Sequence, residues 1–205
     1  MLEVTGESTE IRCPRFQINV SGNDCFPQLG RLDFGILQPK RHFAKGNRMV
    51  HHIPEGANSV SAYLIVKDGQ AALDFYAKAF GGTQAACLTA PDGSVVHGEI
   101  RIGNSTVMIS QENLEWNMKS PETLGGSPVS LHVYVEDADA AYQTALDAGC
   151  TEIMPVSDMF WGDRYGKVVD PFGFQWGIAT HVEDVEPEEM QRRSQAWFAQ
   201  MAGGE

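Results

Sequence analysis

The sequence predicts an α+β fold in which two pseudo-symmetric βαβββ modules form one cleft, with an irregular N-terminal extension and a C-terminal helix. The first observation is an internal repeat: SAYLIVKD, residues 61–68, has a counterpart in SLHVYVED, residues 130–137. The second is that each stretch is followed by an alanine-rich segment whose apolar residues have helical spacing. Two copies are too few for a solenoid, so we expect them to close into one domain.

Composition and charge exclude several classes of protein. Hydrophobic residues make up 42% of the 205-residue chain, which is enough for a core, yet no apolar run approaches the ~18 residues of a membrane span. The net charge of −12 would repel phosphate backbones, so we expect no nucleic-acid partner. The chain opens without a signal-peptide pattern, and its four cysteines are widely spaced, as in reduced cytoplasmic proteins. We therefore expect a cytoplasmic protein without a membrane partner.

The N-terminal part differs from the rest of the chain. Residues 1–48 contain scattered Gly, Pro and Asn without a sustained period of 2 or 3.6 residues, although 11–20 would suit a short strand. We interpret them as an irregular or disordered extension, and a misassigned start codon upstream of Met49 is a second interpretation. The domain itself is expected over residues 57–182.

The first module is expected over residues 60–111. Its helix has apolar residues at helical spacing and stops at a Gly-Gly pair, and a Pro-Asp-Gly turn separates two of its strands. The predicted elements are a strand over 61–66, a helix over 69–80, and strands over 83–89, 95–102 and 106–110.

The second module is expected over residues 129–181, after a polar connector that contains Gly and Pro. It repeats the order of the first module, and a last helix over 184–202 follows it, with acidic residues near its positive end. The predicted elements of the module are a strand over 130–135, a helix over 138–148, and strands over 151–156, 164–169 and 174–180.

Several motifs resemble the vicinal oxygen chelate superfamily, which includes glyoxalase I, extradiol dioxygenases, and bleomycin- and fosfomycin-resistance proteins. They are the paired modules, the helix LDFYAKAFG at 73–81 and the turn DPFG at 170–173. The stretches GGSPVSLH at 125–132 and MFWGDRYG at 159–166, with IATHVED at 178–184, resemble its PhnB-like branch. The resemblance covers roughly residues 57–190 and implies the fold, but the branch is functionally diverse.

The resemblance also identifies positions for a metal. Metal-using members supply ligands from the first and last strands of both modules, and these positions correspond to Ser61, Met108, Ser130 and Gly177. Such residues do not replace the imidazole and carboxylate ligands that a divalent cation needs. We therefore predict no metal and no cofactor, and we do not expect the metal-dependent chemistry of glyoxalase I or the extradiol dioxygenases.

Three polar residues are the candidate catalytic groups: His97, Glu99 and His132. Alternation along the strands places them with Tyr63 and Tyr134 on faces that line the cleft. Three interpretations stay open. The set has the composition of a two-His-one-carboxylate metal site. A histidine would also serve as a general base, with a tyrosine donating to a developing oxyanion. Otherwise these side chains are hydrogen-bonded groups in a wet cleft.

The loop over residues 157–166 is the best candidate for ligand recognition. Trp161 offers a stacking face, and Arg164 offers a planar fork for a carboxylate or phosphate. With Asp163, Tyr63 and Tyr134 they form the predicted ligand-binding set. In the alternative interpretation the loop is a structural brace, in which Asp163 or another aspartate pairs with Arg164.

Together these features predict a homodimeric, metal-independent, PhnB-like protein that binds a small organic molecule of unassigned identity. The first alternative is a non-catalytic protein that sequesters an aromatic or cationic drug, as bleomycin-resistance proteins do. The second is a lyase, isomerase or oxygenase with an atypical metal site.

Overall fold

The computed structural model describes residues 11–12, 17–18, 50–54 and 56–202, and the chain divides into two units, Met1–Glu55 and Gly56–Glu205. In the first unit, β1 (Ile11–Arg12) pairs antiparallel with β2 (Gln17–Ile18), so two very short strands stand where one was expected. The rest of the predicted extension lies outside the described residues. No helix in the described part of the chain is long and apolar enough to span a membrane.

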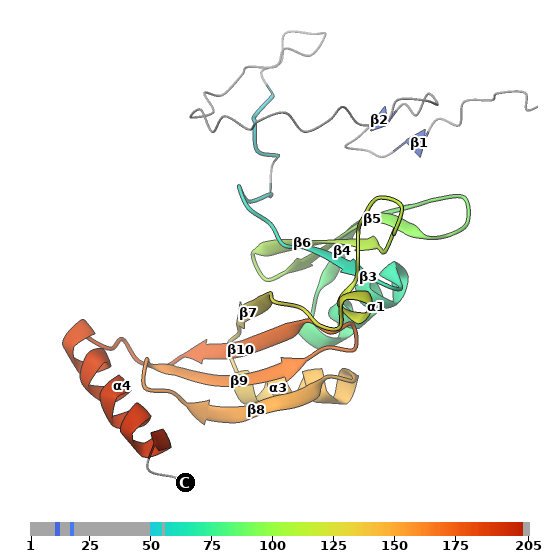
Figure 1. Ribbon diagram of the computed structural model, residues 1–205. Helices are drawn as coiled ribbons and strands as arrows, with labels where there is room; N and C mark the ends of the chain where they lie inside the picture. The colour runs from blue at the N-terminus through green and yellow to red at the C-terminus, as the bar shows by residue number, and fades with distance from the viewer. Residues whose placement is uncertain (1–10, 13–16, 19–49, 55, 203–205) are drawn as a thin grey trace, which may run out of the picture. The chain divides into compact units, whose positions relative to one another are not determined.

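The first module has the expected βαβββ order (Figure 1). Its strands form a four-stranded sheet in the order β3-β6-β5-β4, in which β3 runs parallel to β6 and the other neighbours are antiparallel. The elements are β3 (Tyr63–Val66), α1 (Gly69–Phe80), β4 (Thr83–Thr89), β5 (Val95–Ile102) and β6 (Ser105–Gln111).

The second module repeats this topology, with the sheet order β7-β10-β9-β8 and β7 parallel to β10, so the prediction of two repeated modules is confirmed. The last helix, α4 (Pro187–Ala202), begins three residues later than expected. The elements of the module are β7 (Ser130–Tyr134), α3 (Ala138–Ala148), β8 (Thr151–Asp158), β9 (Asp163–Val169) and β10 (Gln175–His181).

The repeat extends to the helix caps. Asp68 and Asp137 are the N-cap residues of α1 and α3, and each side chain accepts a hydrogen bond of 3.0 Å from a backbone N–H in the first turn. This contact satisfies a donor that the helix itself leaves unpaired. At the other end of α1, Gly81 adopts φ 63°, a left-handed conformation that favours glycine.

The connector between the modules contains a short helix that the sequence analysis did not predict, α2 (Pro121–Leu124). Ser120 caps it by accepting a hydrogen bond from the backbone N–H of Thr123. Pro121 occupies the first turn, where a backbone N–H would have no acceptor within the helix, so the lack of one in proline costs no hydrogen bond. The Ser-Pro-Glu sequence was the available signal, but a helix this short has no apolar period.

The helices lie between the two sheets (Figure 1). The residues of α1 and α3 pack against each other, and each helix also packs on its own sheet. The aromatic ring of Phe80 on α1 stacks on Trp176 of β10 with centroids 4.3 Å apart, so the first module packs directly on the second. The uncovered faces of the sheets therefore lie on opposite sides of the helix layer within one chain.

Asp170, in the DPFG turn, links the two modules through hydrogen bonds. It is buried, and its Oδ2 accepts hydrogen bonds from the Tyr76 hydroxyl at 2.7 Å and from the Trp176 indole N–H at 2.9 Å. Its Oδ1 accepts from the backbone N–H groups of Phe172 and Phe174. One carboxylate thus holds its own turn, β10 and the helix of the other module.

Candidate ligand site on the open faces of the sheets

The open face of the first sheet carries a chain of three polar side chains. Cross-strand register places Tyr63 beside Met108 and Met108 beside Glu99, while His97 is two residues from Glu99 and shares its face. The Tyr63 hydroxyl lies 3.4 Å from His97 Nδ1, and His97 Nε2 lies 3.1 Å from Glu99 Oε1. The sequence analysis placed these residues on one side of the sheet, and the structure joins them.

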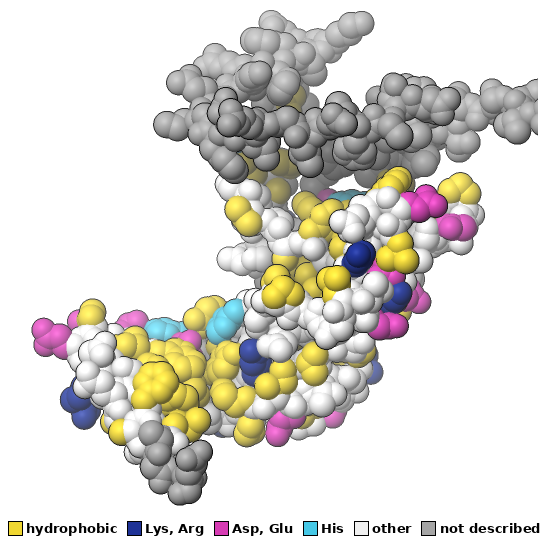
Figure 2. Space-filling model, in the orientation of Figure 1, with side chains coloured by type: hydrophobic (Ala, Val, Ile, Leu, Met, Phe, Trp, Pro, Cys, Tyr) yellow, Lys and Arg dark blue, Asp and Glu magenta, His cyan; other side chains and the backbone are white. Residues whose placement is uncertain are grey.

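The open face of the second sheet is aromatic. His132 and Tyr134 of β7 have ring centroids 4.7 Å apart, and His132 stacks on Tyr165 of β9 at 5.5 Å with an interplanar angle of 13°. Trp161 meets Tyr165 edge-on at 5.7 Å. Histidine side chains are visible at the surface along β7 and the end of β10 in Figure 2, with hydrophobic side chains beside them. This face offers a ligand several stacking surfaces.

Gly177 creates the space that Tyr165 occupies. A Cβ atom at residue 177 would lie 2.6 Å from Tyr165 Cε2 and 3.1 Å from His132 Nδ1. The ring of Tyr165 can therefore approach the backbone of β10 only because residue 177 has no side chain. Tyr165 was not among the predicted site residues, and its burial raises the pKa of its hydroxyl.

Asp163 is the polar centre of this face. Its side chain is buried, and Oδ2 accepts hydrogen bonds from the Tyr134 hydroxyl at 3.2 Å and from the Trp161 indole N–H at 3.0 Å. The sequence analysis expected Asp163 to contact ligand. In the structure it holds two of the other predicted ligand contacts, Tyr134 and Trp161, and its own contact with a ligand stays a prediction.

His181 connects Asp163 to the segment before α4. Its Nδ1 lies 2.8 Å from Asp163 Oδ1 and its Nε2 lies 3.0 Å from Asp184 Oδ1. An ionised carboxylate only accepts hydrogen bonds, so the charged imidazolium, which has a proton on each ring nitrogen, satisfies both contacts. The bonds to Asp184 and Asp163 accordingly raise the pKa of His181. Sequence reasoning missed this residue, since nothing local links it to Asp163.

Arg164 lies on the opposite face of the second sheet. Its guanidinium donates to both carboxylate oxygens of Asp139 on α3 and to Asp158 Oδ1 at 3.0 Å. These bonds raise the pKa of Arg164 and bind β9 to the helix layer. Alternation along β9 explains the separation, because residues 163 and 165 point to one face and residue 164 to the other. The brace interpretation therefore describes the observed contacts of Arg164.

The register also refines the positions of the inherited metal site. Met108 lies beside Tyr63, and Gly177 lies beside His132, two residues along each strand from Ser61 and Ser130. Of these neighbours only His132 has a metal-binding side chain. Within the described residues no three His, Cys, Asp or Glu side chains gather closely enough to hold a metal ion, so one chain does not bring His132 to His97 and Glu99. Metal independence itself stays a prediction.

The fold and the two open faces define a paired βαβββ protein with a polar and an aromatic surface. The family model for the Glyoxalase/Bleomycin resistance protein/Dioxygenase superfamily matches residues 50–178. The chain belongs to this superfamily, which confirms the resemblance found in the sequence.

Similar proteins occur in mycobacteria. The uncharacterized protein Rv0887c of Mycobacterium tuberculosis is 37% identical over 168 residues, which cover 80% of this chain and 92% of the relative. The uncharacterized protein Mb0911c of Mycobacterium bovis is 40% identical over 136 residues, which cover 65% of this chain and 90% of the relative.

Similar chains also occur among solved structures. Protein PA1353 from Pseudomonas aeruginosa matches with a TM-score of 0.50 and 21% identity, over 62% of this chain and 100% of that chain. The PhnB protein from Bacillus cereus matches with a TM-score of 0.48 and 16% identity, over 60% of this chain and 99% of that chain.

Proposed function

We propose that this protein binds a small aromatic molecule, without a metal ion, on the open faces of its sheets. The observation that carries the proposal is the aromatic cluster of His132, Tyr134, Tyr165 and Trp161. His132 and Tyr134 are exposed, and Asp163 holds Tyr134 and Trp161 in place. Tyr134 is 63% exposed although it is large and partly apolar. A fixed, exposed aromatic surface with convergent polar groups is typical of a ligand site.

The binding cleft is completed by a second copy in this proposal. The strands β3 and β7 stand at the edges of their sheets. A groove of about 610 Å³ lies between β7 and the first module, lined by residues such as Val60, Val107 and Val129. Val60 is 87% exposed and Val129 is 54% exposed. An unpaired edge with apolar neighbours is a template for another strand. In a homodimer, β7 of one copy lies beside β3 of the second, and the two open faces form one cleft.

Sedimentation tests the dimer. We expect the wild-type protein to sediment at twice the chain mass and the variant Val129→Asp to sediment as a monomer with an unchanged circular dichroism spectrum. The matched control is Val182→Asp, since Val182 is 57% exposed and does not line the groove. A wild-type monomer at micromolar concentration would contradict the shared cleft.

Binding is tested with a panel of small phenols and other aromatic compounds, followed by indole fluorescence. Trp161→Ala should weaken binding by about 1–3 kcal/mol, as expected for an aromatic anchor. Trp116→Ala is the control, because Trp116 is 67% exposed in the connector, outside the aromatic cluster. Equal affinity of Trp161→Ala and wild type would exclude the aromatic face as the site.

Two other functions stay open to the same experiments. Binding of bleomycin without chemical change would support a drug-sequestering protein, for which the net charge of −12 is favourable toward a cationic ligand. One tightly held metal ion per chain, lost in His132→Ala, would instead support a metal site made from His97 and Glu99 of one copy and His132 of the other. That result would contradict metal independence.

A further inference from the structure

The contacts of the three polar residues on the open face of the first sheet fit one direction of proton donation when the His97 imidazole is neutral. Glu99 accepts from His97 Nε2, because an ionised carboxylate has no proton to donate. In the neutral imidazole the second nitrogen, Nδ1, then carries a lone pair. The Tyr63 hydroxyl lies 3.4 Å from that nitrogen and donates to it. The order is therefore Tyr63 to His97 to Glu99.

Exposure decreases along the same order, from Tyr63 to Glu99. The side chain of Glu99 is 10% exposed and that of His97 is 21% exposed, whereas Tyr63 is 48% exposed. The carboxylate is thus held inside the protein, the imidazole lies between, and only the phenol reaches the surface where a ligand would lie. A buried acid that fixes a histidine tautomer, followed by a hydroxyl, is a general arrangement for activating the hydroxyl.

We propose that Glu99, His97 and Tyr63 form a proton relay in which Tyr63 is the catalytic residue and takes a proton from the hydroxyl group of a phenolic or enolic ligand. The proposal rests on the proposed function, since the ligand has to lie on the open face. The ligand O–H bond breaks as a new O–H bond forms at Tyr63, and the original Tyr63 proton moves to His97 Nδ1. The product pair is a ligand oxyanion and an imidazolium that Glu99 stabilises.

Tyr134 is the natural comparison, because it also lies on an open face and also donates to a partner. Its partner is the carboxylate of Asp163, so loss of the proton would place two negative charges together. Burial and the hydrogen bond to Asp163 raise the pKa of Tyr134. In the proposed relay Tyr63 donates to an uncharged base instead, and its ionised form would lie beside a cation. The two tyrosines should therefore differ in reactivity although Tyr134 is the more exposed.

The test measures the reactivity of each hydroxyl with 4-(2-aminoethyl)benzenesulfonyl fluoride, using peptide mass spectrometry on the full-length protein. In this reaction the tyrosine oxygen bonds to sulfur, fluoride leaves, and the phenolic proton goes to the neighbouring base. We expect Tyr63 to be labelled about tenfold or more faster than Tyr134, within the range of general-base assistance. His97→Gln should remove this advantage and leave the rate at Tyr134 unchanged.

Equal labelling of the two tyrosines in the wild type, or a Tyr63 rate that His97→Gln does not change, would overturn the relay. Nitrogen NMR gives a second measurement: neutral His97 should carry its proton on Nε2, and a proton on Nδ1 would equally overturn it. Labelling needs no bound ligand, so its failure leaves the binding proposal standing. Conversely, failed binding with rapid labelling of Tyr63 would contradict only the proposed ligand.

Discussion

Single buried polar side chains determine how this domain is assembled. Asp170 has four hydrogen-bond donors around one carboxylate, and burial nonetheless raises its pKa above the ordinary value. Because the donors come from α1, the DPFG turn and β10, the residue is required for module packing more than for chemistry. This explains the DPFG motif in physical terms.

Tyr76→Phe should lower the free energy of unfolding by about 1–3 kcal/mol, because a buried acceptor loses one donor while the packing of the ring is kept. Urea denaturation followed by fluorescence measures the change. The control is Tyr63→Phe, at a half-exposed position, where we expect a change below about 0.5 kcal/mol. Similar losses in both variants would show that the hydroxyl of Tyr76 is not what holds the modules.

Gly177→Ala should lower the free energy of unfolding by about 1–3 kcal/mol, because its new methyl group would overlap Tyr165. The backbone of residue 177 needs no positive φ, so the effect is steric. In a Tyr165→Ala background, Gly177→Ala should lower the free energy of unfolding by less than it does in the wild type, because the ring it would overlap is gone. If the two changes are simply additive in urea denaturation, the two residues do not compete for space.

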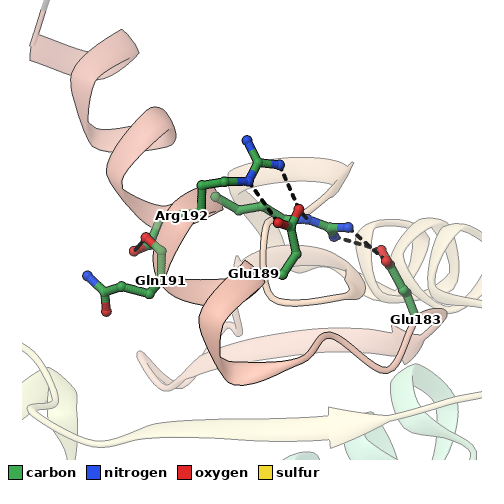
Figure 3. Close-up of polar contacts among 6 residues, drawn as sticks. Glu183, Glu189, Gln191 and Arg192 are labelled. Atoms are coloured by element: carbon green, nitrogen blue, oxygen red, sulfur yellow. Dashed lines mark hydrogen bonds and ion pairs between the residues drawn. The ribbon is translucent and has the colours of Figure 1, made fainter.

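At the scale of elements, α4 is attached mainly through its first turns. Arg193 donates to Glu183 in the preceding segment and to Glu189 one turn earlier, and Arg192 donates only to Glu189. Figure 3 shows Glu189 facing two guanidinium groups, with Glu183 on the segment before the helix. Farther along, Trp197 contacts Phe160 with centroids 5.8 Å apart, while Phe198 is exposed.

Arg193→Gln should increase amide hydrogen exchange over residues 187–202, because it removes the link from α4 to Glu183. Arg192→Gln keeps that link and is the matched control, with little expected change. Mass-spectrometric exchange at neutral pH distinguishes the variants. Equal exchange in both would mean that the apolar contacts alone hold the helix.

The same ion pairs predict acid sensitivity. The bonds from Arg192 and Arg193 lower the pKa of Glu189 from 4.5 to about 2. A folded-state pKa below the unfolded value means stabilisation that is complete above pH 4.5 and is lost as the pH falls toward 2. In wild type, exchange over α4, corrected for its intrinsic pH dependence, should rise across this interval. In Glu189→Gln it should already be high at pH 6.

At the scale of the whole molecule, the described second unit contains both modules and α4 with a continuous core. A chain that begins at Met49 should therefore fold with nearly the thermal midpoint of the full-length protein. Differential scanning calorimetry of the two proteins checks this. A drop of more than about 5 °C, which corresponds to about 1–2.5 kcal/mol for a domain of this size, would show that the first unit contributes to the stability of the second.

The sequence by itself determined the local features of this protein. The repeat, the element order and the bounds of α1 and α3 follow from apolar periodicity, aspartate caps and glycine stops, which act over a few residues. The pairing of His97 with Glu99 was also predictable, because alternation along one strand places both on the same face. Their meeting with Tyr63 depends on the sheet order, in which β6 lies between β3 and β5. The short helix α2 was not predicted, because its only sequence signal is a single Ser-Pro cap.

Only the tertiary structure decided what depends on packing between elements. It packed α1 against α3 and each helix on its own sheet, and within the described residues it did not bring His132 to His97 and Glu99. It also directed Arg164 toward Asp139. The neighbouring residue Asp163 instead contacts Tyr134, Trp161 and His181 through its carboxylate. The physical reason is that successive strand residues point to opposite faces, and which face a helix covers depends on how the whole domain buries its apolar surface.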